Sequence, residues 1–189
     1  TPWFLDRLWE SPWLLRAVSG RGVQTHPAQL GALTVSVLEG THGHQRKELD
    51  KLVHWLRDQP RPDVVDISNS MLIAIAEPLK QALGCPINCT LQGENIFMDG
   101  LLEPYRTRAR ELIRSHVPYV DSFVAVSDYY ARCMSRYLGI PGAKMRVVPL
   151  GVDVDRFRPG PDCEFGPLTI GYLGRMAPEK GVRSLCESY

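Results

Sequence analysis

A glycine and two cations near the end of the chain have the spacing of an anion site. Arg175 follows Gly174 directly, and Lys180 stands shortly after Pro178. Residues 168–173 before them are apolar and typical of a strand buried on both faces, and Pro178 is typical of the first position of a helix. A helix that starts after a glycine turn presents free backbone N–H groups at the positive end of its dipole. The pattern therefore predicts a cradle for a phosphate or diphosphate, with two full charges beside it.

A plainer interpretation of these residues stays open. Arg175 could form a surface ion pair with Glu179, which would contribute little. A glycine-rich strand–turn–helix is also a weak signal by itself. A second motif strengthens it, because the run VVPLGVD occupies residues 147–153 and Phe-Arg-Pro follows at 157–159. The two motifs at this separation favour the diphosphate interpretation.

Together the motifs resemble the GT-B glycosyltransferases of family 4. Those enzymes carry V-x-N-G-V-D-x-x-x-F-x-P between two Rossmann-like domains, and G-R-x-x-x-x-K-G at the first strand–helix turn of the second domain. The resemblance implies that Arg175 and Lys180, with the backbone at Gly174 and Gly151, hold the diphosphate of a nucleotide sugar. Leu150 stands where many members have Asn, but Gly151 still allows a close backbone approach.

The function that the resemblance implies is transfer of a sugar from a nucleotide-diphosphate donor to an acceptor hydroxyl. The acceptor would be a sugar, a lipid-linked molecule or a small molecule. Transfer would retain the anomeric configuration and need neither a metal nor a cofactor. Departure of a nucleoside diphosphate builds negative charge on its phosphate oxygens, and Arg175 and Lys180 would stabilise that charge as Mg²⁺ does in other enzymes.

Two other functions are compared with this one. A nucleotide-dependent oxidoreductase on a Rossmann fold needs G-x-G-x-x-G after a strand, and the run Gly-Tyr-Leu-Gly at 171–174 lacks that spacing. A non-catalytic nucleotide- or sugar-binding Rossmann protein would keep the fold without the chemistry, and this alternative remains open.

The elements that must position these groups alternate along the chain. Strands are expected at 33–38, 63–67, 86–91, 121–126 and 144–149, and helices at 45–57, 70–83, around 112–113 and at 129–138. This order predicts a Rossmann-like parallel sheet with helices on both faces.

The resemblance implies three parts of the chain. Residues 1–150 would form an incomplete GT-B N-terminal, acceptor-side domain, 151–167 a linker, and 168–189 the start of a truncated nucleotide-sugar domain with its first strand, turn and helix. The family binds the donor sugar and ribose through a later acidic segment, E-x-x-x-x-x-x-x-E. We therefore expect these 189 residues alone not to catalyse transfer.

Ligands of parallel sheets bind at the carboxyl ends of the strands, which selects the loops at 39–44, 68–70 and 92–95, and at Ser127. Where family 4 often has T-x-H, this chain has Gln92, which hydrogen-bonds but does not titrate. Gln92 and Glu94 are therefore predicted to position sugar hydroxyls. Equally, Glu94 could cap the following helix.

The loop at 39–44 contains two histidines. His42 and His44 would point to opposite sides of a regular element, and no partner stands at a convincing metal-ligand spacing. We therefore expect no metal there, and an acceptor-side role for His42, His44 and Ser127. Cys85 and Cys89 are three residues apart rather than two, which favours two buried, inert thiols over a redox pair.

Composition excludes some other functions. The formal net charge of +1 gives no general attraction to nucleic acid, and no apolar run approaches the length of a membrane span. Five cysteines without a framework spacing are typical of a reduced, cytoplasmic protein, and no signal peptide is seen. Trp3, Trp9 and Trp13 could contact the inner face of a membrane, although packing against the sheet is the favoured interpretation.

Overall fold

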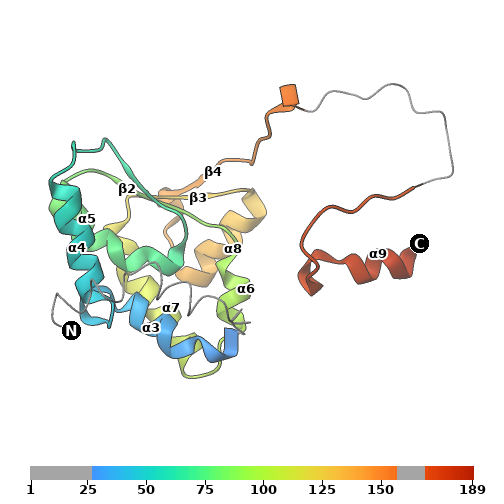
Figure 1. Cartoon of the computed structure of the whole chain (residues 1–189), viewed down its shortest axis with the longest axis horizontal. Coiled ribbons are helices and arrows are strands. Elements are labelled where there is room, and N and C mark those ends of the chain that lie inside the picture. Colours follow the sequence, from blue (N-terminus) through green and yellow to red (C-terminus); the bar gives the residue numbers. More distant parts are fainter. Residues whose placement is uncertain (1–26, 157–168) are drawn as a thin grey trace, which may run out of the picture. The chain divides into compact units, whose positions relative to one another are not determined.

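The computed structural model describes residues 27–156 and 169–189 of the chain (Figure 1). The chain divides into two compact units, Thr1–Leu150 and Gly151–Tyr189. Trp3, Trp9 and Trp13, with the membrane contact considered for them, lie outside the described residues.

A parallel sheet of four strands forms the centre of the first unit. Its strands are β1 (Val65–Ile67), β2 (Ile87–Thr90), β3 (Ser122–Ala125) and β4 (Met145–Val147). They lie side by side in sequence order, and each pairs in parallel with the next. Four of the five strands expected within residues 1–150 are thereby confirmed, each shorter than its predicted range, as is the Rossmann-like α/β fold.

Helices precede and connect the strands. In chain order the described α-helices of this unit, with its longest 3₁₀ helix, are α3 (Gly31–Leu38), α4 (Arg46–Arg57), the 3₁₀ helix η3 (Ser70–Ile75), α5 (Ala76–Leu83), α6 (Glu94–Asp99), α7 (Tyr105–His116) and α8 (Asp128–Leu138). Two helices begin with a side-chain cap, because Asn69 Oδ1 accepts from the Met71 N–H at 3.0 Å and Ser127 Oγ from the Tyr130 N–H at 3.2 Å. The change from 3₁₀ to α geometry comes at Ala76.

The prediction of a strand at 33–38 was wrong, since these residues form most of α3. The β-branched residues suggested a strand, but three of the four buried positions, Gly31, Thr34 and Leu38, repeat with helical spacing. Gly31 lies against the ring of Tyr105 in α7, where a Cβ would collide with that ring. The buried side of α3 is thus marked by a small and a polar residue as well as by leucine, so no apolar period reveals the helix.

One face of the sheet carries the core. Ile87, Cys89 and Phe123 are fully buried on this face and belong to one hydrophobic cluster that also includes Ile113 of α7 and Met134 of α8. Figure 1 shows α3 and α7 below the strands. The described helices therefore pack against this face of the sheet.

The opposite face carries a polar row across three strands. Asn88 donates to Asp66 of β1, and Ser122 Oγ of β3 donates to Asn88 Oδ1 at 2.7 Å. Thr90 Oγ1 reaches the Asp66 carboxylate at 3.0 Å. These side chains are exposed or partly exposed, and they satisfy their hydrogen bonds with one another.

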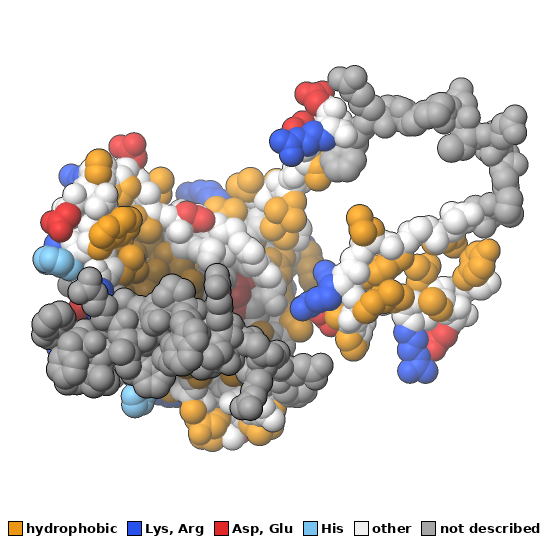
Figure 2. Space-filling view, in the orientation of Figure 1, with side chains coloured by type: hydrophobic (Ala, Val, Ile, Leu, Met, Phe, Trp, Pro, Cys, Tyr) orange, Lys and Arg blue, Asp and Glu red, His pale blue; other side chains and the backbone are white. Residues whose placement is uncertain are grey.

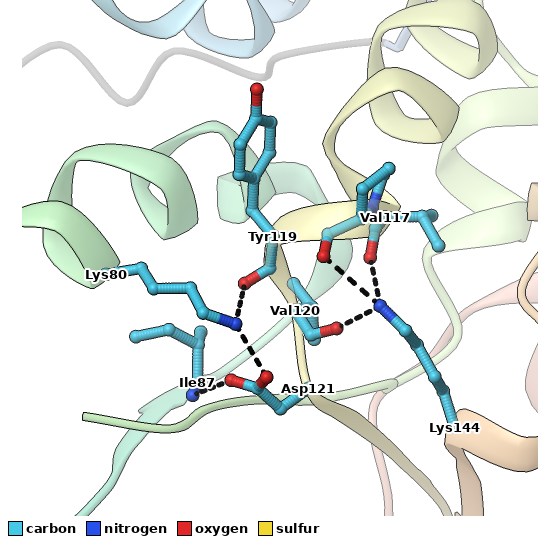
Figure 3. A network of polar contacts seen from close by, with 8 residues as sticks. Lys80, Ile87, Val117, Tyr119, Val120, Asp121 and Lys144 are labelled. Carbon is cyan, nitrogen blue, oxygen red and sulfur yellow. Dashed lines mark hydrogen bonds and ion pairs between the residues drawn. The ribbon is translucent and has the colours of Figure 1, made fainter. Parts of the chain in front are cut away.

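The amino-terminal edge of the sheet is closed by a network of two lysines and an aspartate (Figure 3). Lys80 Nζ lies 2.6 Å from Asp121 Oδ1, and the Ile87 N–H donates to Asp121 Oδ2 at 2.8 Å. Lys144 Nζ donates to three backbone carbonyls, the shortest contact being 2.6 Å to Val120. We call these residues the amino-edge network; they tie α5 and β4 to the start of β3.

The described part of the second unit consists of short elements. These are the 3₁₀ helices η6 (Val154–Arg156) and η7 (Pro178–Lys180) and the helix α9 (Val182–Ser188). Residues 169–173 form no strand, in contrast to the prediction for 168–173, and Leu173 is fully exposed. A parallel strand is stable only beside another strand, and the described residues of this unit contain none.

Candidate functional site

A pocket of about 550 Å³ opens where β1 and β2 end. Asn69, which follows β1, and Gln92, which follows β2, supply its polar groups together with Glu94. The rest of the lining is mostly apolar and comes from α3 and the residue before it, from η3 and from α6: Leu30, Leu33, Val37, Met71, Leu72 and Phe97. We call this space the carboxyl-edge pocket. Its position agrees with the rule that ligands bind beyond the carboxyl ends of parallel strands.

Glu94 is the buried polar centre of this edge, with only 7% of its surface exposed. Its Oε1 accepts from the Ser70 N–H at 2.7 Å, and its Oε2 accepts from the Gln92 N–H at 2.8 Å. The hydroxyl of Tyr130 in α8 donates to the same Oε2 at 3.0 Å and accepts from the Gly93 N–H at 2.6 Å. One carboxylate thus joins the loops after β1 and β2 to α8.

The neighbours of Glu94 respond to its charge and to burial. Burial, followed by the Glu94 carboxylate, raises the pKa of Tyr130, so its phenol keeps the proton that it donates. Burial likewise raises the pKa of the Cys89 thiol, and the charges of Glu94 and Asp66 add to the effect. Cys89 and Cys85 are both buried and free, in agreement with the prediction of inert thiols.

Glu94 stabilises the start of its own helix, α6. Glu94 is the first residue of α6, and its carboxylate accepts from the N–H of Gln92, just before the left-handed cap residue Gly93. It therefore holds the start of its own helix and also the start of η3. Gln92 makes this contact through its backbone N–H, and Gln92 also lines the carboxyl-edge pocket. Gln92 and Glu94 thus come together at one pocket.

His42 and His44 are not brought to this pocket. The loop at 39–44 follows a helix instead of a strand, so the rule of strand ends does not apply to it. His42 lines a separate pocket of about 320 Å³ with Arg108 and His116. The backbone N–H of His44 donates to Ser36 Oγ at 2.9 Å. Burial lowers the pKa of His116, whose Nε2 lies 3.1 Å from the Leu38 carbonyl oxygen.

Ser127 is placed at the end of β3, as the sequence indicated, but its hydroxyl is used as the cap of α8. Sequence reasoning missed Tyr130 and the α3 side chains of the carboxyl-edge pocket. Tyr130 could have been suspected, because it is the third residue of a helix that starts at a strand end. The α3 residues could not, since they had been assigned to a strand.

The predicted diphosphate residues lie in the second unit. Arg175 forms an ion pair with Glu179 at 2.7 Å, and both side chains are solvent-accessible. Lys180 ends η7, and Gly181, with φ of 69°, precedes α9. The α-helix thus begins at Val182 rather than at Pro178, so the N–H groups after Gly174 belong to a loop and a 3₁₀ turn.

The two glycines predicted for the donor site differ in their surroundings. A Cβ at Gly174 would lie 2.8 Å from the hydroxyl of Tyr172, whereas one at Gly151 would meet nothing within 4 Å. Apolar side chains gather on the second unit, as Figure 2 shows, and its exposed residues include Ile170, Leu173 and Met176. This unit therefore presents much of its apolar surface to solvent.

Residues 27–156 and 169–189 contain no group of three or more His, Cys, Asp or Glu side chains arranged to hold a metal ion. Within the same ranges, none of the helices combines the length and the apolar character that a membrane crossing requires.

Comparison with known proteins gives one positive result. Residues 27–156 match the family model described as Glycosyltransferase Family 4, which covers more than half of the chain. The comparisons with curated proteins and with solved structures gave no match. The matched residues contain the whole four-stranded sheet, Gln92, Glu94 and the carboxyl-edge pocket. The resemblance inferred from the motifs is thereby confirmed, and the chain belongs to glycosyltransferase family 4.

Proposed function

We propose that this chain carries the acceptor side of an enzyme that moves a sugar from a nucleotide-diphosphate donor to an acceptor hydroxyl. The family supports a glycosyltransferase-type function in general, with a sugar donor and an acceptor as partners. The observation that carries the proposal is the carboxyl-edge pocket, where an amide, a carboxylate and an apolar wall surround one space.

The pocket supports an acceptor with both a polar and an apolar part. The Gln92 amide can donate to one hydroxyl and accept from another, so it is suited to orienting a sugar or alcohol group. Leu33 and Leu72 line the pocket and are partly exposed, so they offer apolar surface to a ligand. Glu94 would act through position, because its oxygens already accept three hydrogen bonds.

The donor diphosphate is proposed to bind at Arg175, Lys180 and the backbone near Gly174. The exposed Arg175–Glu179 ion pair is weak support for the fold and is easily exchanged for a phosphate contact. Positive charge there would stabilise the leaving diphosphate without a bound metal, and we propose that the anomeric configuration is retained. No cofactor is part of this proposal.

The test of the donor site uses an enzyme that contains this chain together with the acidic segment of the family. Release of nucleoside diphosphate is followed with a panel of donors and acceptors. Arg175→Ala and Lys180→Ala should each lower kcat/KM about 10²-fold, as loss of one transition-state donor does. Arg183→Ala is the matched control, because Arg183 forms the same i,i+4 ion pair, with Glu187, at 2.7 Å. Equal turnover in Arg175→Ala, Lys180→Ala and Arg183→Ala would contradict the donor assignment.

The acceptor side is tested with the same assay. Gln92→Ala should raise the KM for the acceptor about tenfold, the loss of roughly one good hydrogen bond, and leave the KM for the donor unchanged. His42→Ala, in the separate pocket, is the control. Turnover should survive chelation, and NMR of the product should give the anomeric configuration of the donor. An unchanged acceptor KM in Gln92→Ala would place the acceptor elsewhere.

A further inference from the structure

A second polar pocket lies between α7 and α8, and arginines dominate it. Its volume is about 540 Å³, which is in the range of small-molecule sites. Arg110 and Arg114 come from α7, and Arg132 and Arg136 come from α8. The two helices direct other residues, among them Ala109, Ile113, Ala131 and Met134, into the buried interior. We call this space the arginine pocket. It shares no lining residue with the carboxyl-edge pocket.

Positive charge is concentrated around the arginine pocket, although the chain as a whole is nearly neutral. The formal net charge of the whole chain is +1, yet α7 and α8 together contain six arginines against two carboxylates, Glu111 and Asp128. Glu111 is paired at 3.6 Å with Arg108, which does not line the pocket. Among the described residues, none of the four pocket arginines forms an ion pair with a carboxylate.

Two of these arginines are held in place by Tyr137. The guanidinium carbon of Arg110 lies 5.1 Å from the centre of the Tyr137 ring, and Arg114 Nη2 donates to the Tyr137 carbonyl oxygen at 3.0 Å. The Tyr137 hydroxyl in turn donates to Asp99 Oδ1 at 2.6 Å, which fixes the ring. Arg110 Nε is buried and has no hydrogen-bond partner in the described structure. The positions of these charges are therefore set in advance, and one buried donor is left unused.

The other two arginines extend the pocket toward solvent. Arg132 and Arg136 are one helical turn apart on α8 and exposed, and their guanidinium groups make no hydrogen bond within the described residues. Four like charges around one hollow repel one another, and an anion with several acceptor oxygens relieves that repulsion. The planar guanidinium fork matches two oxygens of one phosphate, so arginine is the side chain best suited to this ligand.

We propose that the arginine pocket binds a phosphate-bearing ligand at a site separate from the proposed donor and acceptor sites. Arg110 and Arg114, held by Tyr137, contact the phosphate from α7, and Arg132 and Arg136 contact it from α8. A free phosphate ester and a phospholipid head group share this chemistry. The inference rests on the charges and contacts of α7 and α8 and does not require that the enzyme transfers sugar.

The experiment uses the whole chain with Arg175→Ala and Lys180→Ala as background, so that the proposed donor site cannot bind the probe. Sodium pyrophosphate is titrated by calorimetry. Binding should be observed, and Arg132→Gln/Arg136→Gln should weaken it at least tenfold. Arg46→Gln/Arg57→Gln on α4 removes the same charge away from the pocket and should leave the affinity within about twofold. Loss of affinity by the same factor in both pairs would mean that net charge alone attracts the probe, and would overturn the proposal.

A parallel arm separates the two sources of phosphate. Co-sedimentation is measured with vesicles of phosphatidylcholine alone and with vesicles that contain phosphatidylglycerol. Binding to the anionic vesicles that Arg132→Gln/Arg136→Gln abolishes, without pyrophosphate binding, assigns the site to a lipid head group. Pyrophosphate binding without vesicle binding assigns it to a soluble ligand. If neither probe binds, the proposal is wrong.

Cys133 gives a readout that needs no substitution in the pocket. It lines the pocket and is partly buried, so a bound phosphate should shield it. The rate of maleimide labelling at Cys133, followed peptide by peptide with mass spectrometry, should fall severalfold when the binding probe is added. Labelling at the exposed Cys186 should not change. Unchanged labelling at Cys133 under saturating probe would exclude the arginine pocket.

Discussion

The two edges of the sheet are both rich in hydrogen bonds, but they use them differently. At the amino edge, Lys80 pairs with Asp121, and Asp121 and Lys144 bond to the nearby backbone, so the polar groups are satisfied within the network. At the carboxyl edge, Glu94 joins as many elements, yet the residues around it line an open pocket. A dense polar network is therefore no sign of a functional site by itself. The space beside the network makes the difference.

The strongest test of this comparison is to remove the centre of the carboxyl edge. Glu94→Ala leaves the N–H groups of Ser70 and Gln92 and the hydroxyl of Tyr130 without their acceptor in a buried place. The free energy of unfolding should fall by about 3 kcal/mol, measured by urea denaturation. Glu94→Gln keeps the shape and one acceptor oxygen and should lose less. A loss below about 1 kcal/mol in Glu94→Ala would show that this network does not hold the edge together.

A smaller effect is expected at the amino edge. Lys144→Met keeps the apolar stem but removes the contacts of Nζ to the carbonyls of Val117, Pro118 and Val120. The expected loss is about 1–2 kcal/mol in the free energy of unfolding. Lys51→Met removes an exposed lysine from the surface pair with Glu48 and should cost less than about 0.5 kcal/mol. If the two lysine variants lose the same amount, the amino-edge network adds nothing beyond a surface ion pair.

The smallest effect depends on pH. Burial pushes the pKa of Asp121 upward, but the hydrogen bonds from Lys80 and Ile87 and the charges of Lys80 and Lys144 outweigh it, so the folded pKa lies below the ordinary value of 3.8. Its stabilising effect is therefore complete above pH 3.8 and disappears as the pH falls through the folded value.

Urea denaturation of the wild type and Asp121→Asn tests this pH dependence. The wild type should be the more stable at pH 7, and the difference should shrink toward zero in stronger acid. A difference that stays constant down to strong acid would exclude the ionised carboxylate as its cause.

Much of the first unit was predictable because its signals are local. Ile87 and Cys89 alternate with polar residues along one strand, and Asn69 and Ser127 stand directly before helices as caps. Gly84 and Gly139, both in the left-handed conformation, end α5 and α8. Each of these features depends on residues that are close together in the sequence, so it can be predicted from the sequence alone.

The errors come from contacts between distant segments. Helix α3 looked like a strand because Val35 and Val37 favour strands, whereas in the structure it packs through Gly31 against Tyr105 of α7. The error moved His42 to a strand end where it does not lie. The contact between Glu94 and Tyr130 likewise joins residues 36 positions apart. The place of Gln92 was predictable, because ligands bind at the carboxyl ends of parallel strands and Gln92 follows the correctly predicted strand β2.

The order of the strands has a consequence for synthesis. Each strand pairs with the strand that immediately precedes it in the chain, and paired residues are separated by roughly 20 to 35 positions. Once the ribosome has synthesised β1 and β2, these two strands can pair. Each later strand then pairs with a strand that has already been synthesised. The sheet can therefore grow from β1 toward β4 as the polypeptide emerges, without an earlier strand having to be held open for a later one.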